Sequence, residues 1–396
     1  MKKEDYKRIT VNGAPAYILR EGVENLRKVS TLLFDCDGVL IDARDSYNRS
    51  ISRTVSYLAN ELLKTSLPEK YISDSLLFNF RKSGGFNNDW DTSFAILLYL
   101  FTRLPKETLT KYEKLNRILQ DSKSSELIDR IIKAKKLLQD AKKSDENPQI
   151  IIRGLNMLAK KADKRGLASM EEMLLRKHLK EASKGFYKLM LYPERIGVST
   201  VSTVFEEMFL GPELFNRKYG VKPRFLNNGS GLIANEEPTA TDSALTTFTE
   251  TFGKNCLGIV SGRSYVTAQF TLGDKLKKFS ENLTVFIEDE ITLALDKGDY
   301  EIIKKIGKPN PYGLLKAEKN APKNGKILYI GDSKEDIIMV KQANKSINRF
   351  ISAGVYGCSH QQKDIVDLFI ESGVYLITKS VNDFDRLLET IAGGEK

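Results

Sequence analysis

The sequence has few cysteines and histidines, and both shortages limit the chemistry open to it. Its three cysteines, Cys36, Cys256 and Cys358, are far apart and odd in number, which argues against a disulfide framework and favours a reducing cytoplasm. With only His178 and His360, the composition argues against a histidine metal site or a histidine-based catalytic triad. Any catalysis would therefore depend on carboxylates.

A long apolar run is also lacking. Met1–Gly13 is charged and contains no apolar segment of the kind found in a secretory signal. The longest apolar run, Phe94–Phe101, is far too short to cross a bilayer. We therefore expect a cytoplasmic protein with no membrane span. Its 396 residues, 41% hydrophobic and 29% charged, are enough for two or more globular domains.

Positive charge is concentrated in one segment. The net charge is +10, and Pro105–Gly185 alone holds 20 Lys or Arg against 12 Asp or Glu. These lysines are interspersed with acids at helical spacing, and aromatic residues are few. A solvated helical face is therefore favoured over a surface for nucleic acid or an acidic partner.

Two carboxylates directly follow an apolar run near the N-terminus. Thr31–Phe34 is short, apolar and rich in strand formers, so it predicts a buried strand with Asp35 at its C-terminal end. Asp37 comes two residues later, and Gly38 allows a sharp turn. Open α/β sheets bind ligands at the carboxyl ends of their strands. The pair could bind a hard cation and share nucleophilic and acid–base work, or simply end a strand in an Asp-Gly turn.

Three later segments repeat this pattern of polar residues after apolar strands or beside prolines. They are Cys256–Val260 followed by Ser261, Gly262 and Arg263; Lys308 before Pro309; and Ile327–Ile330 followed by Asp332 and Asp336.

Each of these polar residues has a structural alternative. Ser261 could be a helix N-cap, and Lys308 an exposed lysine beside a turn. Asp332 and Asp336 could be a helix cap and part of an exposed helix face. For Arg263, contact with a substrate phosphate or carboxylate competes evenly with a structural ion pair.

The distribution of strands and helices predicts an α/β fold. After residue 250, strands alternate with helices, which is typical of a parallel sheet covered on both faces. We predict a core of residues 1–42 and 250–396, in which 1–30 is an N-terminal extension with a hairpin at Asn12-Gly13. Residues 43–249 should form a mainly α-helical domain that includes the basic insertion at about 105–185. The strand candidates are Leu257–Val260, Thr284–Ile287, Ile327–Ile330, Arg349–Ser352 and Val374–Ile377, with an acidic loop at Glu288–Glu290 near the site.

In chain order, the motifs are strand-Asp-x-Asp, strand-Ser, Lys and strand-Gly-Asp-x-x-x-Asp. This order resembles the four motifs of the haloacid dehalogenase-like (HAD) hydrolase superfamily, over residues 30–42 and 250–396. The resemblance implies a Rossmann-like parallel sheet, the HAD fold, with a helical cap domain inserted after the first strand. The insertion is longer than such caps usually are, so the shape of the cap is not implied.

The resemblance also implies catalytic roles. Asp35 would be the nucleophile that forms an aspartyl-phosphate, and Asp37 the general acid and base. Ser261 and the Gly262 amide would bind phosphoryl oxygens, and Lys308 would supply a fixed positive charge. Haloacid dehalogenases lack an acid at the position of Asp37, which favours phosphate esters over carbon–halogen bonds.

A Mg²⁺ ion is implied as the cofactor. The side chains of Asp35 and Asp332 and the backbone carbonyl of Asp37 would bind it, and Asp336 would face the same ion directly or through water. All are hard oxygen ligands of the kind Mg²⁺ prefers.

The stretch Lys82–Asp91 is similar to caps of the phosphoglycolate-phosphatase-like subgroup. On one interpretation it is a specificity loop in which Asn87 and Asn88 contact the substrate. On the other, Asn88 or Asp89 caps a helix and Trp90 packs in the cap.

Together these features predict a magnesium-dependent phosphatase for a small phosphorylated metabolite, similar to phosphoglycolate or a sugar phosphate. One alternative is a phosphomutase of the same superfamily. Another is a non-enzymatic protein that binds nucleic acid or an acidic partner through the basic insertion. The pattern carries no signal for an oligomeric state.

Overall fold

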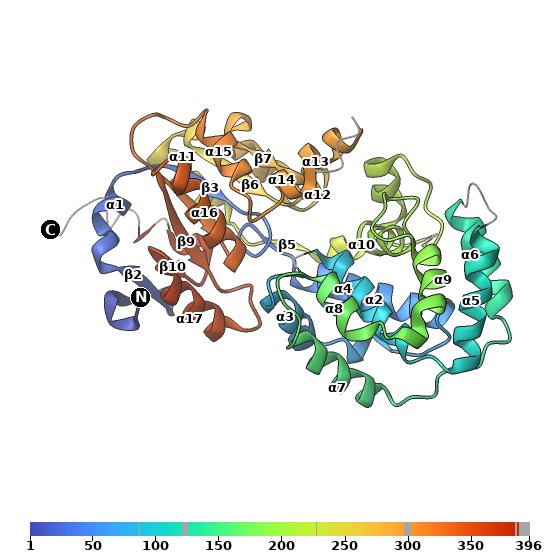
Figure 1. Cartoon of the computed structure of the whole chain (residues 1–396). Coiled ribbons are helices and arrows are strands. Elements are labelled where there is room, and N and C mark those ends of the chain that lie inside the picture. The colour runs from blue at the N-terminus through green and yellow to red at the C-terminus, as the bar shows by residue number, and fades with distance from the viewer. Residues whose placement is uncertain (87, 121–125, 227, 297–301, 385, 388–396) are drawn as a thin grey trace. The chain divides into compact units, whose positions relative to one another are not determined.

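The computed structural model describes the chain apart from residues 87, 121–125, 227, 297–301, 385 and 388–396 (Figure 1). The chain divides into two compact units, and the first is made of two separate segments. Met1–Arg44 and Glu236–Lys396 form the first unit, and Asp45–Asn235 forms the second.

The first unit is built on one large sheet, which confirms the predicted α/β fold. Among the described residues the sheet has eight strands in the order β1-β2-β10-β9-β8-β3-β6-β7. The pairs from β10 to β7 are parallel, whereas β1–β2 and β2–β10 are antiparallel. The strands are β1 Tyr6–Val11, β2 Ala14–Leu19, β3 Val29–Phe34, β6 Leu257–Ser261, β7 Val285–Phe286, β8 Lys326–Gly331, β9 Phe350–Val355 and β10 Leu376–Thr378.

The predicted N-terminal hairpin is present, and it belongs to the core sheet. Asn12 and Gly13 have φ of 49° and 78°, the left-handed geometry that two-residue hairpin turns need and that Asn-Gly favours. Strand β2 then pairs with β10, with Ile18 opposite Leu376. The N-terminal extension thus adds two strands to the core sheet at one edge.

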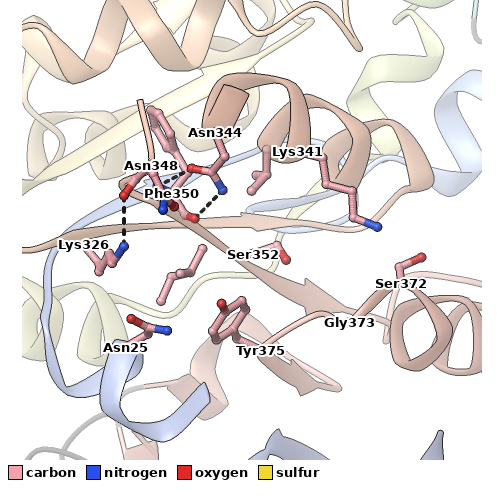
Figure 2. Close-up of a pocket in the computed structure, with 12 residues that line it drawn as sticks. Asn25, Lys326, Lys341, Asn344, Asn348, Phe350, Ser352, Ser372, Gly373 and Tyr375 are labelled. Atoms are coloured by element: carbon pink, nitrogen blue, oxygen red, sulfur yellow. Dashed lines mark hydrogen bonds between the residues drawn. The ribbon is translucent and has the colours of Figure 1, made fainter. Parts of the chain in front are cut away.

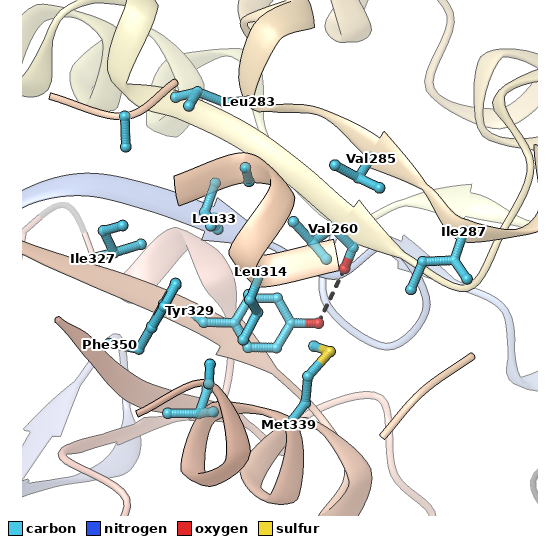
Figure 3. Packing of buried hydrophobic residues seen from close by; sticks show 14 of the residues in the cluster. Leu33, Val260, Leu283, Val285, Ile287, Leu314, Ile327, Tyr329, Met339 and Phe350 are labelled. Atoms are coloured by element: carbon cyan, nitrogen blue, oxygen red, sulfur yellow. Dashed lines mark hydrogen bonds between the residues drawn. The ribbon is translucent and has the colours of Figure 1, made fainter. Parts of the chain in front are cut away.

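Helices cover both faces of the central strands. Successive side chains of a strand point to opposite faces, so Leu33 lies in the cluster with Val260 and Leu314 (Figure 3). Phe34 faces the other way, with ring centroids 5.7 Å from both Phe248 and Phe279. The α-helices of this unit are α1 Val23–Arg27, α11 Asp242–Phe252, α12 Tyr265–Leu272, α13 Ile287–Asp296, α14 Ile302–Ile306, α15 Tyr312–Glu318, α16 Lys334–Ser346 and α17 Gln362–Ser372.

Residues 236–249, expected in the helical domain, lie in the first unit. Strand β5 (Glu237–Pro238) pairs with β4 (Ile41–Asp42), and the Thr239 amide donates to the Leu40 carbonyl at 2.9 Å. Helix α11 begins at Asp242 and buries its apolar face against β3. These contacts move the boundary from 250 to Glu236.

The predicted acidic loop Glu288–Glu290 is instead the first turn of helix α13. The preceding strand, expected over Thr284–Ile287, is limited to Val285–Phe286. Three acidic residues are favourable at a helix N-terminus, where the backbone amides carry partial positive charge. The loop prediction was wrong because it ignored this signal.

The second unit is helical among its described residues. Gly185 of α9 lies so close to α5 that a Cβ there would be 2.0 Å from the Tyr112 carbonyl oxygen, and Phe186 stacks on Phe101 at 4.7 Å. Most of its helices are α2 Arg44–Glu61, α3 Asp74–Lys82, α4 Asp89–Thr102, α5 Lys106–Gln120, α6 Leu127–Leu138, α7 Pro148–Ala159, α8 Leu167–Leu174, α9 Lys180–Met190 and α10 Thr200–Tyr219.

Helices of the basic segment expose lysines and bury apolar residues, as a solvated helical face does. Lys106, Lys114 and Lys136 are exposed, while Leu115 and Ala134 on the same helices are buried. In the part of the chain that the structure describes, no helix has the length and apolar character needed to cross a membrane.

Candidate active site

The ends of three adjacent parallel strands form the base of the candidate site. Phe34, the last residue of β3, pairs with Ile259 of β6 on one side and Ile330 of β8 on the other. The residues that follow these strands therefore emerge at the same edge of the sheet. The Asp35 amide donates to the Ile330 carbonyl at 2.9 Å, which fixes Asp35 beside the end of β8.

The turn after β3 brings Asp332 close to the loop that follows Asp35. Gly38 has φ of 75°, and its amide donates to the Ile41 carbonyl at 2.8 Å. A Cβ on Gly38 would lie 2.0 Å from Asp332 Oδ2. Glycine is therefore required here both by backbone geometry and by the space that the Asp332 carboxylate occupies.

Three carboxylates converge at this edge. Asp35, Asp332 and Asp336 each place an oxygen within 4.8 Å of the others'. Asp35 is 7% exposed and Asp336 is 3% exposed. The alternative of an exposed helix face is therefore wrong for Asp336, which lies on the inner side of α16.

A buried ammonium group links two of these carboxylates. Lys308 Nζ donates to Asp35 Oδ2 at 2.7 Å, to Asp336 Oδ1 at 2.9 Å and to the Tyr329 hydroxyl at 2.9 Å. These contacts use the three N–H donors of a lysine. The side chain is 11% exposed, so the alternative of an exposed surface lysine is wrong.

The hydrogen bonds of Asp336 define how it can act. Its Oδ1 accepts from Lys308 and from the Tyr329 hydroxyl, at 2.9 and 3.0 Å. Its Oδ2 accepts from the Asp332 amide and from the amide and hydroxyl of Ser333, which form a capping box at the start of α16. A carboxylate offers about four acceptor positions, and these are occupied. Asp336 thus organises the site, and a metal contact through water suits it better than a direct one.

Crowding of negative charge changes the pKa values of the site. Burial, together with Asp336 and Asp37, raises the pKa of Asp35 to about 6 despite the opposing charge of Lys308. Burial and the neighbouring Asp336 and Asp35 carboxylates raise the pKa of Asp332 well above its usual range. Burial opposes the charge of Lys308, but the two aspartates keep its pKa well above the usual value. The three carboxylates of Asp35, Asp332 and Asp336 thus carry more negative charge than the Lys308 ammonium can neutralise.

This donor set fits a magnesium ion. Asp35 and Asp332 supply hard carboxylate oxygens within reach of one another, and Mg²⁺ prefers such ligands completed by water. A divalent cation would also neutralise the excess negative charge that raises both pKa values. The fit rests on the chemistry and spacing of these side chains.

Ser261 and Gly262 lie at the end of the neighbouring strand. Ser261 is the last residue of β6 and is 1% exposed. The following helix α12 begins at Tyr265 with Ser264 at its N-cap, so the N-cap alternative for Ser261 is wrong. A Cβ on Gly262 would meet nothing within 4 Å, which leaves open space beside the Gly262 backbone.

Arg263 is held inside the protein by carboxylates. Its guanidinium donates to both oxygens of Glu236 at 2.7 and 2.9 Å, and Nη2 lies 2.6 Å from Asp37 Oδ1. The Arg263 side chain has no exposed surface. The geometry therefore favours the structural ion pair over the predicted substrate contact.

The glycine-containing loop of the second unit has the predicted helix cap. The Asn88 side chain accepts from the Trp90 amide at 2.8 Å at the start of α4. The Trp90 indole donates to Glu206 at 3.1 Å, and the buried Phe86 ring packs on Phe80 at 5.0 Å. These contacts confirm the capping role of Asn88, whereas its substrate contact stays a prediction. Asn87 lies outside the described residues.

Sequence analysis missed two residues of this network, Tyr329 and Glu236. Tyr329 lies within the predicted apolar run of strand β8, and its ring is indeed in the core. Its hydroxyl, however, also contacts the Val260 carbonyl oxygen at 3.1 Å (Figure 3). A usable signal existed, because a buried tyrosine hydroxyl generally needs a partner. Glu236 gives no local signal, because its partner Arg263 is brought to it only by the fold.

Replacing Tyr329 with phenylalanine should weaken the site without dismantling it. Lys308 would keep both aspartates but lose one acceptor, and Asp336 would lose one donor. We expect the free energy of unfolding to fall by about 1–2 kcal/mol and turnover to fall by about tenfold. Chemical denaturation and steady-state kinetics check this, and unchanged values for both would contradict the role given to the hydroxyl.

A pocket of about 290 Å³ lies at the amino ends of strands β8 and β9, at the other end of the strands from the acidic cluster (Figure 2). Its lining includes Lys326, the first residue of β8, whereas the acidic cluster follows the last residue of that strand. Lys326 donates to the Asn348 carbonyl at 3.0 Å, and Asn344 exchanges two hydrogen bonds with the Phe350 backbone. These polar groups support the structure at the amino ends of the strands.

Comparisons with known proteins bear on the same residues. A family model described as haloacid dehalogenase-like hydrolase matches residues 29–344, which include strands β3, β6 and β8 of the acidic site and Lys308. A solved structure, phosphatase Tt82 from Thermococcus thioreducens, is 19% identical, with a TM-score of 0.49, and the match covers 92% of this chain and 99% of that chain. No curated protein matches the chain.

Proposed function

Because the chain belongs to the haloacid dehalogenase-like hydrolases, we propose that it is a magnesium-dependent phosphatase. It would transfer the phosphoryl group of a small metabolite first to Asp35 and then to water. The observation that carries this proposal is the Asp35 carboxylate, held 2.7 Å from Lys308 Nζ beside Asp332 at the ends of parallel strands.

Phosphoryl transfer depends mainly on positioning and on neutralising charge. Asp35 is fixed on both oxygens, because Oδ1 accepts from the Cys36 amide at 2.8 Å and Oδ2 from Lys308. Such fixation favours in-line attack on phosphorus by removing the freedom of the carboxylate. Asp37, two residues on, would protonate the leaving oxygen and then take a proton from the attacking water.

The remaining groups would bind the phosphoryl oxygens. The Ser261 hydroxyl and the Gly262 amide lie at the end of β6, next to the strand that carries Asp35. Asp35, Asp332 and the Asp37 carbonyl would hold magnesium, and Asp336 would contact it through a water. The ion would offset the repulsion between the Asp35 carboxylate and the substrate phosphate.

The substrate class proposed is a small phosphorylated metabolite, similar to phosphoglycolate or a sugar phosphate. The second unit would act as the cap and supply polar contacts from the loop that ends at Asn88. This part of the proposal rests on the likeness of Lys82–Asp91 to caps of the phosphoglycolate-phosphatase-like subgroup.

A panel of phosphate monoesters with magnesium tests the activity. The proposal predicts release of inorganic phosphate from 4-nitrophenyl phosphate and faster release from at least one small metabolite. Product analysis separates the hydrolase from a phosphomutase, which would return an isomeric phosphate ester. Isomer formation without free phosphate would contradict the proposal.

Asp332 gives a test of the metal site that does not require turnover. Since its pKa is raised in the folded protein, Asp332→Asn should relieve repulsion and leave the metal-free protein at least as stable at pH 7.5. The same change should remove stabilisation by magnesium, which for the wild type amounts to about 2.7 kcal/mol when free magnesium is about 100 times its Kd. Thermal unfolding with magnesium or with a chelator measures both effects.

The pH dependence of this magnesium effect has a definite sign. Asp35 has a folded pKa of about 6, raised from 3.8, so between these values the folded protein holds a proton that the unfolded chain releases. That contribution to stability is present at low pH and is lost as pH rises through about 6. Magnesium binds the deprotonated carboxylates. Adding magnesium should therefore raise the Tm of the protein more at pH 7.5 than at pH 5. An equal increase at both values would contradict the assigned ligands.

A further inference from the structure

Asp37, proposed above as the general acid and base, contacts a fully enclosed guanidinium. Arg263 Nη2 lies 2.6 Å from Asp37 Oδ1, and neither the Arg263 nor the Glu236 side chain has exposed surface. Glu236 takes both terminal nitrogens of Arg263, at 2.7 and 2.9 Å. Thr271 in turn donates to Glu236 Oε2 at 2.8 Å. A chain of fixed contacts therefore runs from α12 to Asp37.

The two oxygens of the Asp37 carboxylate need not be equally exposed to solvent. Its side chain is 36% exposed, yet the Oδ1 atom is enclosed in the protein. The exposed surface therefore belongs to the rest of the carboxylate. Arg263 thus lies against the enclosed oxygen, and the exposed surface is on the other atoms of the Asp37 side chain.

We propose that Arg263 and Glu236 are positioning residues that orient the Asp37 carboxylate so that its outer oxygen meets the leaving group of the substrate. This inference rests on the proposed function and extends it to two residues with no assigned part in the reaction. Glu236 fixes the guanidinium plane by two parallel hydrogen bonds, the strongest arrangement open to an Arg–carboxylate pair. Arg263 then fixes Asp37.

The charges of Glu236 and Arg263 support these positioning roles. Arg263 alone beside Asp37 would leave a guanidinium able to rotate or to pair with a phosphate. With Glu236 on its other side, the guanidinium has one defined orientation, and it is shielded from the substrate. The arrangement is thus suited to aim a carboxylate and poorly suited to bind phosphate directly.

The dependence of rate on the leaving group tests the proposal. A general acid matters most for esters whose leaving oxygen is strongly basic, and its contribution is about 10²–10⁴-fold. We expect Arg263→Lys to lower kcat/KM for alkyl phosphates by about tenfold or more relative to 4-nitrophenyl phosphate. The ratio is informative because a merely structural defect would lower both rates together.

A double-mutant cycle separates positioning from general damage. If Arg263 acts through Asp37, Arg263→Lys should have no further effect on this ratio in an Asp37→Asn background. Glu236→Gln, which keeps the side-chain shape and one acceptor oxygen, should shift the ratio in the same direction by a smaller factor, and it serves as the test if Arg263→Lys does not fold. Arg349→Lys is the control, because Arg349 forms a partly buried ion pair with Glu318, 2.6 Å between Nη1 and Oε1, outside the acidic cluster.

The outcomes distinguish this inference from the function on which it rests. A wild-type protein that releases no phosphate, or an unchanged ratio in Asp37→Asn, would overturn the proposed function and this inference with it. A ratio that shifts in Asp37→Asn but not in Arg263→Lys or Glu236→Gln would overturn the inference alone. Equal effects of Arg263→Lys with and without Asp37 would do the same.

Discussion

Replacing Asp35 with asparagine should reduce phosphate release by about 10⁴-fold or more. The amide cannot form the covalent intermediate, and no other carboxylate has the same position at the end of β3. The fold should survive, because burial disfavours the charged form of Asp35 and raises its pKa, so a neutral side chain avoids that penalty. The expected cost in unfolding free energy is about 1–3 kcal/mol, from the exchange of one hydrogen-bond acceptor for a donor.

A second buried aspartate provides the control for this variant. Asp383 is 4% exposed and accepts from Asn12 and from the Ser380 amide, outside the acidic cluster. Asp383→Asn should therefore change stability by a similar amount while kcat stays near the wild-type value. Equal residual activity in Asp35→Asn and Asp383→Asn would remove Asp35 as the nucleophile.

Replacing Lys308 with methionine should affect both activity and stability. The three acceptors of its ammonium would lose their donor, and the buried carboxylates would face one another without the cation. Removing one partner of a buried ion pair costs about 3–5 kcal/mol, and losing a fixed charge at a transferring group costs about 10²–10³-fold in turnover. Urea denaturation and kinetics with saturating magnesium measure the two losses.

The loss of stability in Lys308→Met should grow as pH rises. Lys308 lowers the pKa of Asp336 in spite of its burial, so in the wild type this carboxylate contributes stability that is lost only in acid. Without the ammonium, the folded protein would favour protonated Asp35 and Asp336, and stability would fall between about pH 4 and pH 7. Adding Asp336→Asn should recover part of the stability but not the activity.

Lys326→Met is the matched control for Lys308→Met. Lys326 begins β8, at the opposite end of the strand from Asp332, and its Nζ donates to the Asn348 carbonyl at 3.0 Å. Its replacement should leave turnover unchanged. A similar loss in both lysine variants would show that general damage, and not the shared ammonium, explains the effect.

Strand ends were the part of the site most accessible from sequence. Asp35, Ser261 and Asp332 each follow a short apolar run, and adjacent parallel strands necessarily bring such residues to one edge. The sequence pattern therefore predicted the sheet and these positions together. The roles of the polar residues that follow the strands were harder to predict, because a helix-capping residue and a metal or substrate ligand can have the same local sequence.

Lys308 and Glu236 show where local pattern stops being informative. Lys308 lies in a loop after α14, and no periodicity indicates that its ammonium reaches Asp35 and Asp336. Its assignment depended on the order of motifs. Glu236 lies where the chain returns to the first unit, and its pairing with Arg263 is a purely tertiary contact. Tyr329 is intermediate, since its burial was predictable but the partners of its hydroxyl were not.

The central claim is that Asp35 carries the phosphoryl group between substrate and water. An acid quench during turnover of the wild-type protein with magnesium, followed by peptide mass analysis, tests it most directly. We predict one additional phosphoryl group on the peptide that contains Asp35, assigned to that carboxylate, and none in Asp35→Asn. A phosphoryl group found on another residue would contradict the account, as would turnover with unmodified Asp35 and inversion of configuration at phosphorus.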